Sequence, residues 1–165
     1  MGQILSSFTV GWPGSISRNA DDIVISQVNR ESTAEIAFGA PVWLSSDGKG
    51  VRNWASGDTM TNFVGFAVRS PSKTPDVYPA GSSQDTGSRG SWKPGEPVDV
   101  LVRGCMAVQA SGSPRAGGQV YLDATTGRVT ASAGTSNLAL TGVHFRKESS
   151  SSGSAEIVLT QRTTI

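Results

Sequence analysis

The residue types that most often carry out catalysis are few in this chain. There is one histidine, His144, and one cysteine, Cys105. A nucleophilic triad needs a base beside its nucleophile, and the Gly-Val-His-Phe-Arg sequence around His144 has no nucleophile elbow. We expect His144 to point outward or into a contact. We expect Cys105 to be a small buried apolar side chain.

The residue spacings typical of metal sites and phosphate sites are also missing from the sequence. The pair Asp21-Asp22 and the single residues Asp47, Asp58 and Asp123 are scattered, and they follow no calcium-loop pattern. The Gly117-Gly118 pair precedes a strand pattern, whereas phosphate-binding loops lead into a helix. Two distant carboxylates could still meet in the fold as in a glycosidase, but nothing in the sequence indicates such a pair. The sequence therefore predicts no enzyme, no catalytic, cofactor-binding or metal residues, and no cofactor.

The charge balance bears on the class of partner. The formal net charge is only +1, so we expect neither nucleic acid nor an anionic membrane surface as a partner. There is no apolar run of 18 residues, and the N-terminus lacks signal-peptide features. Met1–Ser6 fits the N-terminal acylation pattern, but no polybasic stretch follows to supply a second membrane signal. The sequence predicts synthesis in a cytoplasm.

The composition predicts an all-β fold. Only 16% of the residues are charged and 20 are glycine, which suits short strands joined by turns. Eight to ten short strands with turn residues between them indicate a small β-barrel or β-sandwich.

A short cassette occurs twice in the chain. Gly39–Leu44 and Gly117–Leu122 each contain glycine and then a strand of the form valine, aromatic, leucine. A second matching strand follows each copy, at 63–69 and at 140–146. The offsets are 78 residues for the first strand and 77 for the second, so His144 aligns with Ala67. We predict two similar β-units, at about 33–69 and 110–146, within one domain.

Alternation within these strands predicts which side chains share a face. Val42 and Leu44 should lie on one face, with Trp43 on the other. In the second strand, Val64, Phe66 and Val68 should share a face. Gly65 lies on the opposite, small side, which permits another backbone to approach closely.

The chain divides into an extended N-terminal arm at 1–20 and a single β-domain at 21–165. Residues 33–38 alternate as a strand, while 17–30 fit either a strand or a short helix. Residues 70–97 contain five of the eight prolines, with much Ser, Gly and Thr. This long loop separates the two units, and its composition fits both a functional loop and a covered linker.

Several segments together resemble a known family. Ser32–Val42, Phe63–Arg69, Gly95–Gly104 and Gly117–Leu122 are similar, in order and spacing, to segments of the structural cement (head decoration) proteins of tailed bacteriophages. The resemblance covers about 30–160 and omits the arm and the 70–97 loop. It implies a small β-domain on the outer surface of the phage head, bridging neighbouring major capsid subunits. It also implies a homo-oligomer, with a trimer favoured and a dimer possible.

An adhesive protein of this kind needs apolar anchors in place of an active site. We expect Ile4, Phe8 and Trp12 of the arm, and Trp92 of the loop, to lie at interfaces, because aromatic anchors dominate binding energy. Trp43 and Trp54 fit the core and an interface equally well. Two alternatives remain: a carbohydrate-binding or adhesin-like β-module, and a structural protein of the tail or baseplate.

Overall fold

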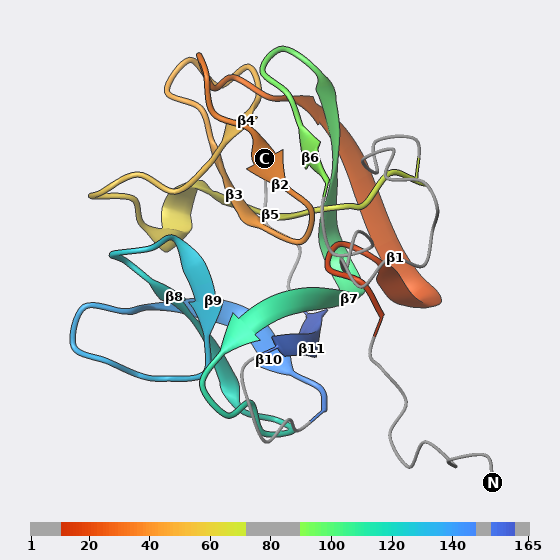
Figure 1. The fold of residues 1–165 in the computed structure, drawn as a ribbon, viewed down its shortest axis with the longest axis vertical. Coiled ribbons are helices and arrows are strands. Elements are labelled where there is room, and N and C mark those ends of the chain that lie inside the picture. The colour runs from red at the N-terminus through yellow and green to blue at the C-terminus, as the bar shows by residue number, and fades with distance from the viewer. Residues whose placement is uncertain (1–10, 72–89, 148–152, 161–165) are drawn as a thin grey trace, which may run out of the picture.

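The chain folds as an all-β protein in this computed structural model, which describes residues 11–71, 90–147 and 153–160 (Figure 1). One short 3-10 helix, η1 (Met60–Asn62), precedes β5. The strands are β1 (Ile16–Val28), β2 (Ile36–Ala37), β3 (Pro41–Leu44), β4 (Val51–Arg52), β5 (Phe63–Ala67), β6 (Ser91–Trp92), β7 (Pro97–Ser111), β8 (Gln119–Asp123), β9 (Arg128–Thr130), β10 (Leu138–Phe145) and β11 (Gly153–Leu159). Among the described residues, no helix has the length and apolar character needed to cross a bilayer.

Five strands close into a ring that we call barrel B. β7 pairs with β11, β11 with β10, β10 with β8, β8 with β9, and β9 returns to β7. The β7–β9 pair is parallel, with Ala110 opposite Val129, and the other pairs are antiparallel. Because a closed ring leaves no unpaired edge, barrel B has no open strand at which another chain could add.

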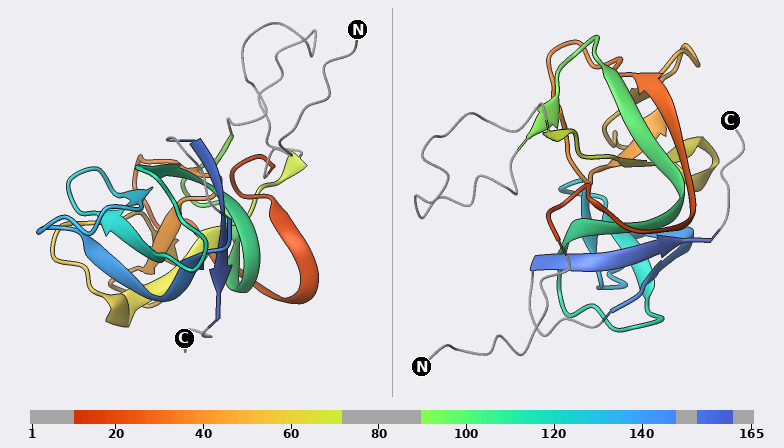
Figure 2. Two further views of the ribbon diagram at one scale, coloured as in Figure 1. Left: turned by 90° about the horizontal axis from the view of Figure 1, so that it is seen from below. Right: turned by 90° about the vertical axis from the view of Figure 1, so that its right-hand side faces the viewer.

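The remaining long strands form a second unit, barrel A, which shares β7 with barrel B. β7 pairs with β5, β5 with β3 and β3 with β4, while β1 pairs with the other side of β7. A parallel bridge between Asn29 and Val51 links the end of β1 to β4. From Gly104 onward β7 pairs with β11 of barrel B, while β1 stays paired with β7 as far as Met106. Figure 2 shows this long, bent strand running between the two halves.

The two barrels repeat the same strand pairing. Leu44 pairs with Val51 in barrel A, and Leu122 pairs with Val129 in barrel B, which is an offset of 78 on both strands. The prediction of an all-β fold made of two similar units is confirmed. The offset of 77 for the second strand was wrong by one residue. His144 pairs with Gln119 as Phe66 pairs with Pro41, so it takes the place of Phe66 and not that of Ala67.

Two apolar clusters fill the molecule. The first lies inside barrel A and includes Val42, Val64, Ala67, Val98 and Val100. The second fills barrel B and extends to the junction, where it includes Trp43, Phe63 and Phe66 of barrel A. Val42 and Trp43 thus point to opposite faces of β3, as predicted, and Leu44 packs on the barrel A cluster with Val42. Burying these side chains is the main force that holds the two units together.

The predicted face of β5 was wrong because the strand is irregular at Gly65. Val42 lies opposite Gly65, but the next residue, Trp43, lies opposite Phe63, so the register shifts within the strand. As a result Val64 faces the barrel A core, whereas Phe66 faces the junction. The predicted close approach is confirmed, since a side chain at Gly65 would collide with the carbonyl oxygen of Leu101.

The structure also shows which secondary structure the N-terminal segments form. Residues 16–28, where strand and helix both fitted, are the strand β1. Its first residues pair with β7, so the segment from Ile16 onward is part of barrel A. The strand expected at 33–38 is limited to Ile36–Ala37, which pairs with β6 as a small separate sheet. The division into an arm and a domain remains a prediction for residues 1–10, which lie outside the described residues.

Candidate binding groove

The residues with catalytic potential are not brought together. His144 is half-buried on β10 between Gln119 and Val158 on the neighbouring strands. Cys105 is a buried free cysteine, and burial raises the pKa of its thiol. Within the described part of the chain, no group of three or more His, Cys, Asp or Glu side chains could hold a metal ion. The candidate functional site is a groove on the surface of the protein.

A groove with a volume of about 470 Å³ runs between the two barrels. One wall is residues 37–41, which connect β2 to β3 in barrel A. The other wall is Gln109, Ser154 and residues 127–129 of barrel B, and Trp12 with Pro13 completes the lining. The groove exists because β7 holds the two units side by side. Such clefts at the junction of two units are common places for ligands to bind.

Trp12 presents its indole ring at this groove on a fixed backbone. Its side chain is 46% exposed, the largest value among the exposed large apolar residues of the described chain. Two residues later, the Gly14 amide donates to the carbonyl of Ala107 at 2.8 Å, and the Gly14 carbonyl accepts from the Arg69 amide at 2.8 Å. Pro13 and Gly14 are themselves buried. The backbone that carries the ring is therefore fixed before any partner arrives, which lowers the entropy cost of binding.

The chemistry of the groove is mixed. The indole of Trp12 and the rings of Pro13 and Pro41 supply apolar surface. Gln109 and Ser154 can donate and accept hydrogen bonds, and the exposed Arg128 carries a positive charge. A tryptophan surrounded by polar groups is the usual composition of an energetically important contact between proteins. The groove is suited to an apolar side chain or short segment of another protein.

The interface candidates have different outcomes. Trp12 lies at the groove, as just described, while Ile4 and Phe8 lie outside the described residues. The prediction that Trp92 lies at an interface was wrong. Trp92 is only 5% exposed, and its Nε1 donates to the Val68 carbonyl at 3.0 Å. Its ring also packs edge-on against Phe38, with 5.9 Å between centroids. Trp92 is therefore a core residue of barrel A and offers no ring to a partner.

The walls of the groove could not be found from local sequence patterns. Residues 37–41 and 127–129 are far apart in the chain, and only the sharing of β7 brings them together. Val24 and Val28 on β1 are 41% and 39% exposed, and their exposure was not predicted either. Alternation of side chains between the two faces of a strand could have indicated these exposed positions, but the segment fitted a helix as well as a strand.

The comparison with protein families gives a match over nearly the whole chain. Residues 4–160 match the family described as "Structural cement protein (E217 gp24/Pam3 gp6)". The chain belongs to this family of phage structural cement proteins. It is therefore a structural protein of the phage capsid, and its location is the virion. Among curated proteins, no sequence matches the chain.

Two solved structures match the chain. A chain from "The capsid of Myoviridae Phage XM1" is 16% identical with a TM-score of 0.68, over 97% of this chain and 96% of that one. The N base of the head fiber gp8.5 in bacteriophage phi29 is 8% identical with a TM-score of 0.42, over 88% of this chain and 99% of that one. The first shows that the fold occurs in a phage capsid structure, and the second is too distant to support an argument.

Proposed function

We propose that this protein binds the outer surface of the phage head and bridges neighbouring major capsid subunits, which stabilises the shell. The observation that supports this most directly is the family match over residues 4–160. A cement protein acts by mechanical adhesion, so it needs a rigid body and binding surfaces in place of catalytic groups. The shared strand β7 and the continuous apolar cluster across the junction provide a rigid body.

The groove at Trp12 is the surface that we assign to the capsid subunit. It combines an exposed, preorganised tryptophan with polar groups and a positive charge. Because many copies would act on one shell, each contact can be of modest affinity and still hold the shell firmly. A homo-oligomer, with a trimer favoured over a dimer, fits this role, since an oligomer touches several capsid subunits at once.

Electron microscopy of heads tests the proposal. Purified protein would be added to heads that lack it, and the difference density would be calculated. We expect density for the two barrels on the outer surface, over the boundaries between capsid subunits. Density within the tail, or on the inner surface, or no binding at all, would contradict the proposed function. A glycan array is a further check, because selective sugar binding lost in Trp12→Ala would favour an adhesin-like module.

A further inference from the structure

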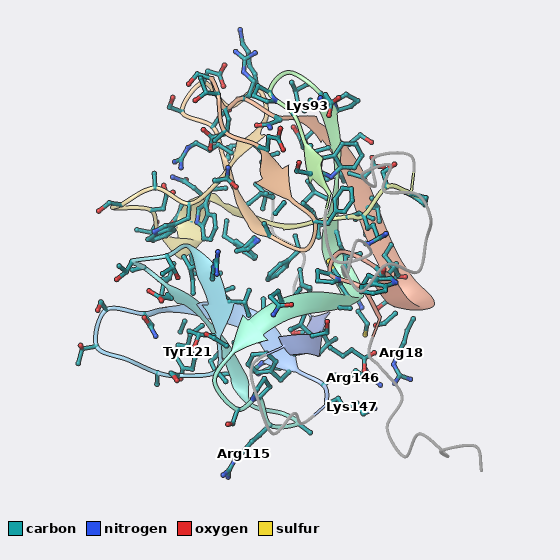
Figure 3. The ribbon with its side chains drawn as sticks, viewed as in Figure 1. Arg18, Lys93, Arg115, Tyr121, Arg146 and Lys147 are labelled. Carbon is teal, nitrogen blue, oxygen red and sulfur yellow. The ribbon has the colours of Figure 1, made fainter. Side chains whose placement is uncertain are left out.

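A cluster of positive charge lies at one end of barrel B and includes Arg18 from the adjoining start of β1. It consists of Arg18, Arg115, Arg146 and Lys147, all four exposed, and we call it the basic end. Figure 3 shows these four side chains in the lower half of the molecule, whereas Lys93 lies at the opposite end. The total formal charge of the chain is only +1, so positive charge is concentrated here and the rest of the chain is nearly balanced or negative.

The backbone fixes the segments that carry these side chains next to one another. The Gly117 amide donates to the Phe145 carbonyl at 2.7 Å, which places the Arg115 turn against the start of the 146–147 segment. The Arg146 amide donates to the Glu156 carbonyl at 2.8 Å. The Nε of Arg18 lies 3.0 Å from the carboxylate of Glu156. Three segments distant in sequence thus present cations at one end of barrel B.

The nearby carboxylates do not cancel this charge. Glu156 is the acidic residue within the cluster; it is 5% exposed, and its charge is offset by Arg18. Asp21 is paired with Arg103 at 2.5 Å, and Asp22 accepts a hydrogen bond from the Cys105 amide. Glu148 follows Lys147 in the sequence, outside the described residues. With Asp22 and Glu148 counted, four cations face three carboxylates, and one of those three, Glu156, is buried.

We propose that the basic end docks on an acidic surface of a capsid subunit, as a second contact separate from the groove. This rests on the proposed function and names the chemistry of the partner, a cluster of Asp and Glu side chains. Complementary charge across an interface accelerates association and fixes orientation. Two contacts at different places on one rigid body are what a bridge between subunits requires. A nucleic acid is the less suitable partner, because four cations with no aromatic platform are a small footprint for it.

The test uses charge reversal with a matched control. The basic-end variant is Arg115→Glu with Lys147→Glu, since neither side chain forms an ion pair among the described residues. Arg18 and Arg146 stay unchanged because they contact Glu156 and Cys105.

The control is Lys49→Glu with Lys93→Glu, which makes the same change of charge on exposed residues of barrel A. Circular dichroism and thermal melting check that both variants fold, and Arg115→Ala with Lys147→Ala serves as a milder version.

Binding to heads that lack the protein is measured by co-sedimentation at roughly 50, 150 and 300 mM NaCl, a series that runs from weak to strong screening of charge. At 150 mM, about physiological strength, we expect the basic-end variant to bind roughly tenfold more weakly, and the control within about twofold of the wild type. The wild type and the control should weaken as salt rises, while the basic-end variant changes little.

The outcomes separate this inference from the proposed function. If the wild type binds heads and both variants bind equally well, the acidic docking surface is wrong while the cement function stands. If the wild type does not bind heads at any salt concentration, the proposed function itself fails. If the wild type binds linear duplex DNA more tightly than heads, and the basic-end variant loses that binding, the partner is nucleic acid and the inference is overturned.

Discussion

Gly14 and Gly39 lie in direct backbone contact. A Cβ atom added to Gly39 would lie 2.8 Å from the Gly14 nitrogen, and one added to Gly14 would lie 3.0 Å from the Gly39 nitrogen. Both residues have positive φ angles, of 83° and 73°, which side chains disfavour. This contact attaches the segment that carries Trp12 to the wall of the groove, so the position of the indole depends on two residues without side chains.

We predict that Gly39→Ala destabilises the fold and displaces Trp12. The substitution combines a strained φ with a collision against backbone that cannot move aside easily, and we expect a loss of about 2–3 kcal/mol in the free energy of unfolding. Urea denaturation measures the stability, and binding to heads measures the displacement of Trp12.

Gly48→Ala is the matched control, because Gly48 has a φ of 66° and no atom within 4 Å of the added Cβ. It should cost about 1 kcal/mol and leave binding unchanged. Equal losses for both variants would mean that the Gly14–Gly39 contact is not important.

Two tryptophans separate binding from stability. Trp12→Ala should leave the free energy of unfolding within about 1 kcal/mol of the wild type, because the ring is 46% exposed, but should weaken binding to heads by roughly tenfold or more. Trp92→Ala should cost about 3–5 kcal/mol, because the ring is buried and its N–H is hydrogen-bonded. Denaturant unfolding and co-sedimentation would be measured for both. A large loss of stability in Trp12→Ala would show that the ring belongs to the core.

Trp43 and Tyr121 occupy the same place in the two units, but only Trp43 lies at the junction. The Trp43 ring packs edge-on against Trp54 and Phe63, with 5.0 and 5.4 Å between centroids, and the Trp54 Nε1 donates to the Ala124 carbonyl of barrel B at 3.0 Å. Trp43→Ala should cost about 3–5 kcal/mol. Tyr121 is half-buried and lies outside both core clusters, so Tyr121→Ala should cost less than about 1.5 kcal/mol. Similar values for the two variants would contradict the junction assigned to Trp43.

The Arg18–Glu156 pair predicts a pH dependence of stability. Burial alone would raise the pKa of Glu156, but hydrogen bonds from Arg18 and Ser17 and the charges of Arg18 and Arg146 outweigh it, so this pKa lies below its usual value of 4.5. The stabilising contribution is therefore complete above about pH 4.5 and is lost as the pH falls through the lower, folded-state pKa. Glu156→Gln should be about 1 kcal/mol less stable than the wild type at neutral pH, because Arg18 is exposed and its interaction is screened.

Denaturant unfolding at a series of pH values measures this difference. The gap between Glu156→Gln and the wild type should shrink as the pH falls from about 4.5 through the lower folded-state pKa, below which the wild-type carboxylate is also neutral. A gap that stays constant across the acidic range would show that the carboxylate charge does not contribute.

The class of fold and the repeat could be predicted because both depend on local patterns. The order of glycine, valine, aromatic and leucine recurs in β3 and β8, and turn residues separate the strands. The register of β5 could not be predicted, because the irregularity lies at Gly65, where the backbone of Leu101, distant in sequence, approaches closely. Trp92 was misassigned for a similar reason. Its partners, Phe38 and Val68, are distant in sequence, and nothing local distinguishes a covered tryptophan from an exposed one.

The central claim is that this protein stabilises an assembled phage head by binding across its subunits. The most direct measurement is the temperature at which filled heads release their DNA, followed with a DNA-binding dye, with and without saturating amounts of the protein. We expect a higher release temperature with the wild type, and a much smaller increase with Trp12→Ala at the same concentration. A release temperature that the bound wild-type protein leaves unchanged would contradict the claim.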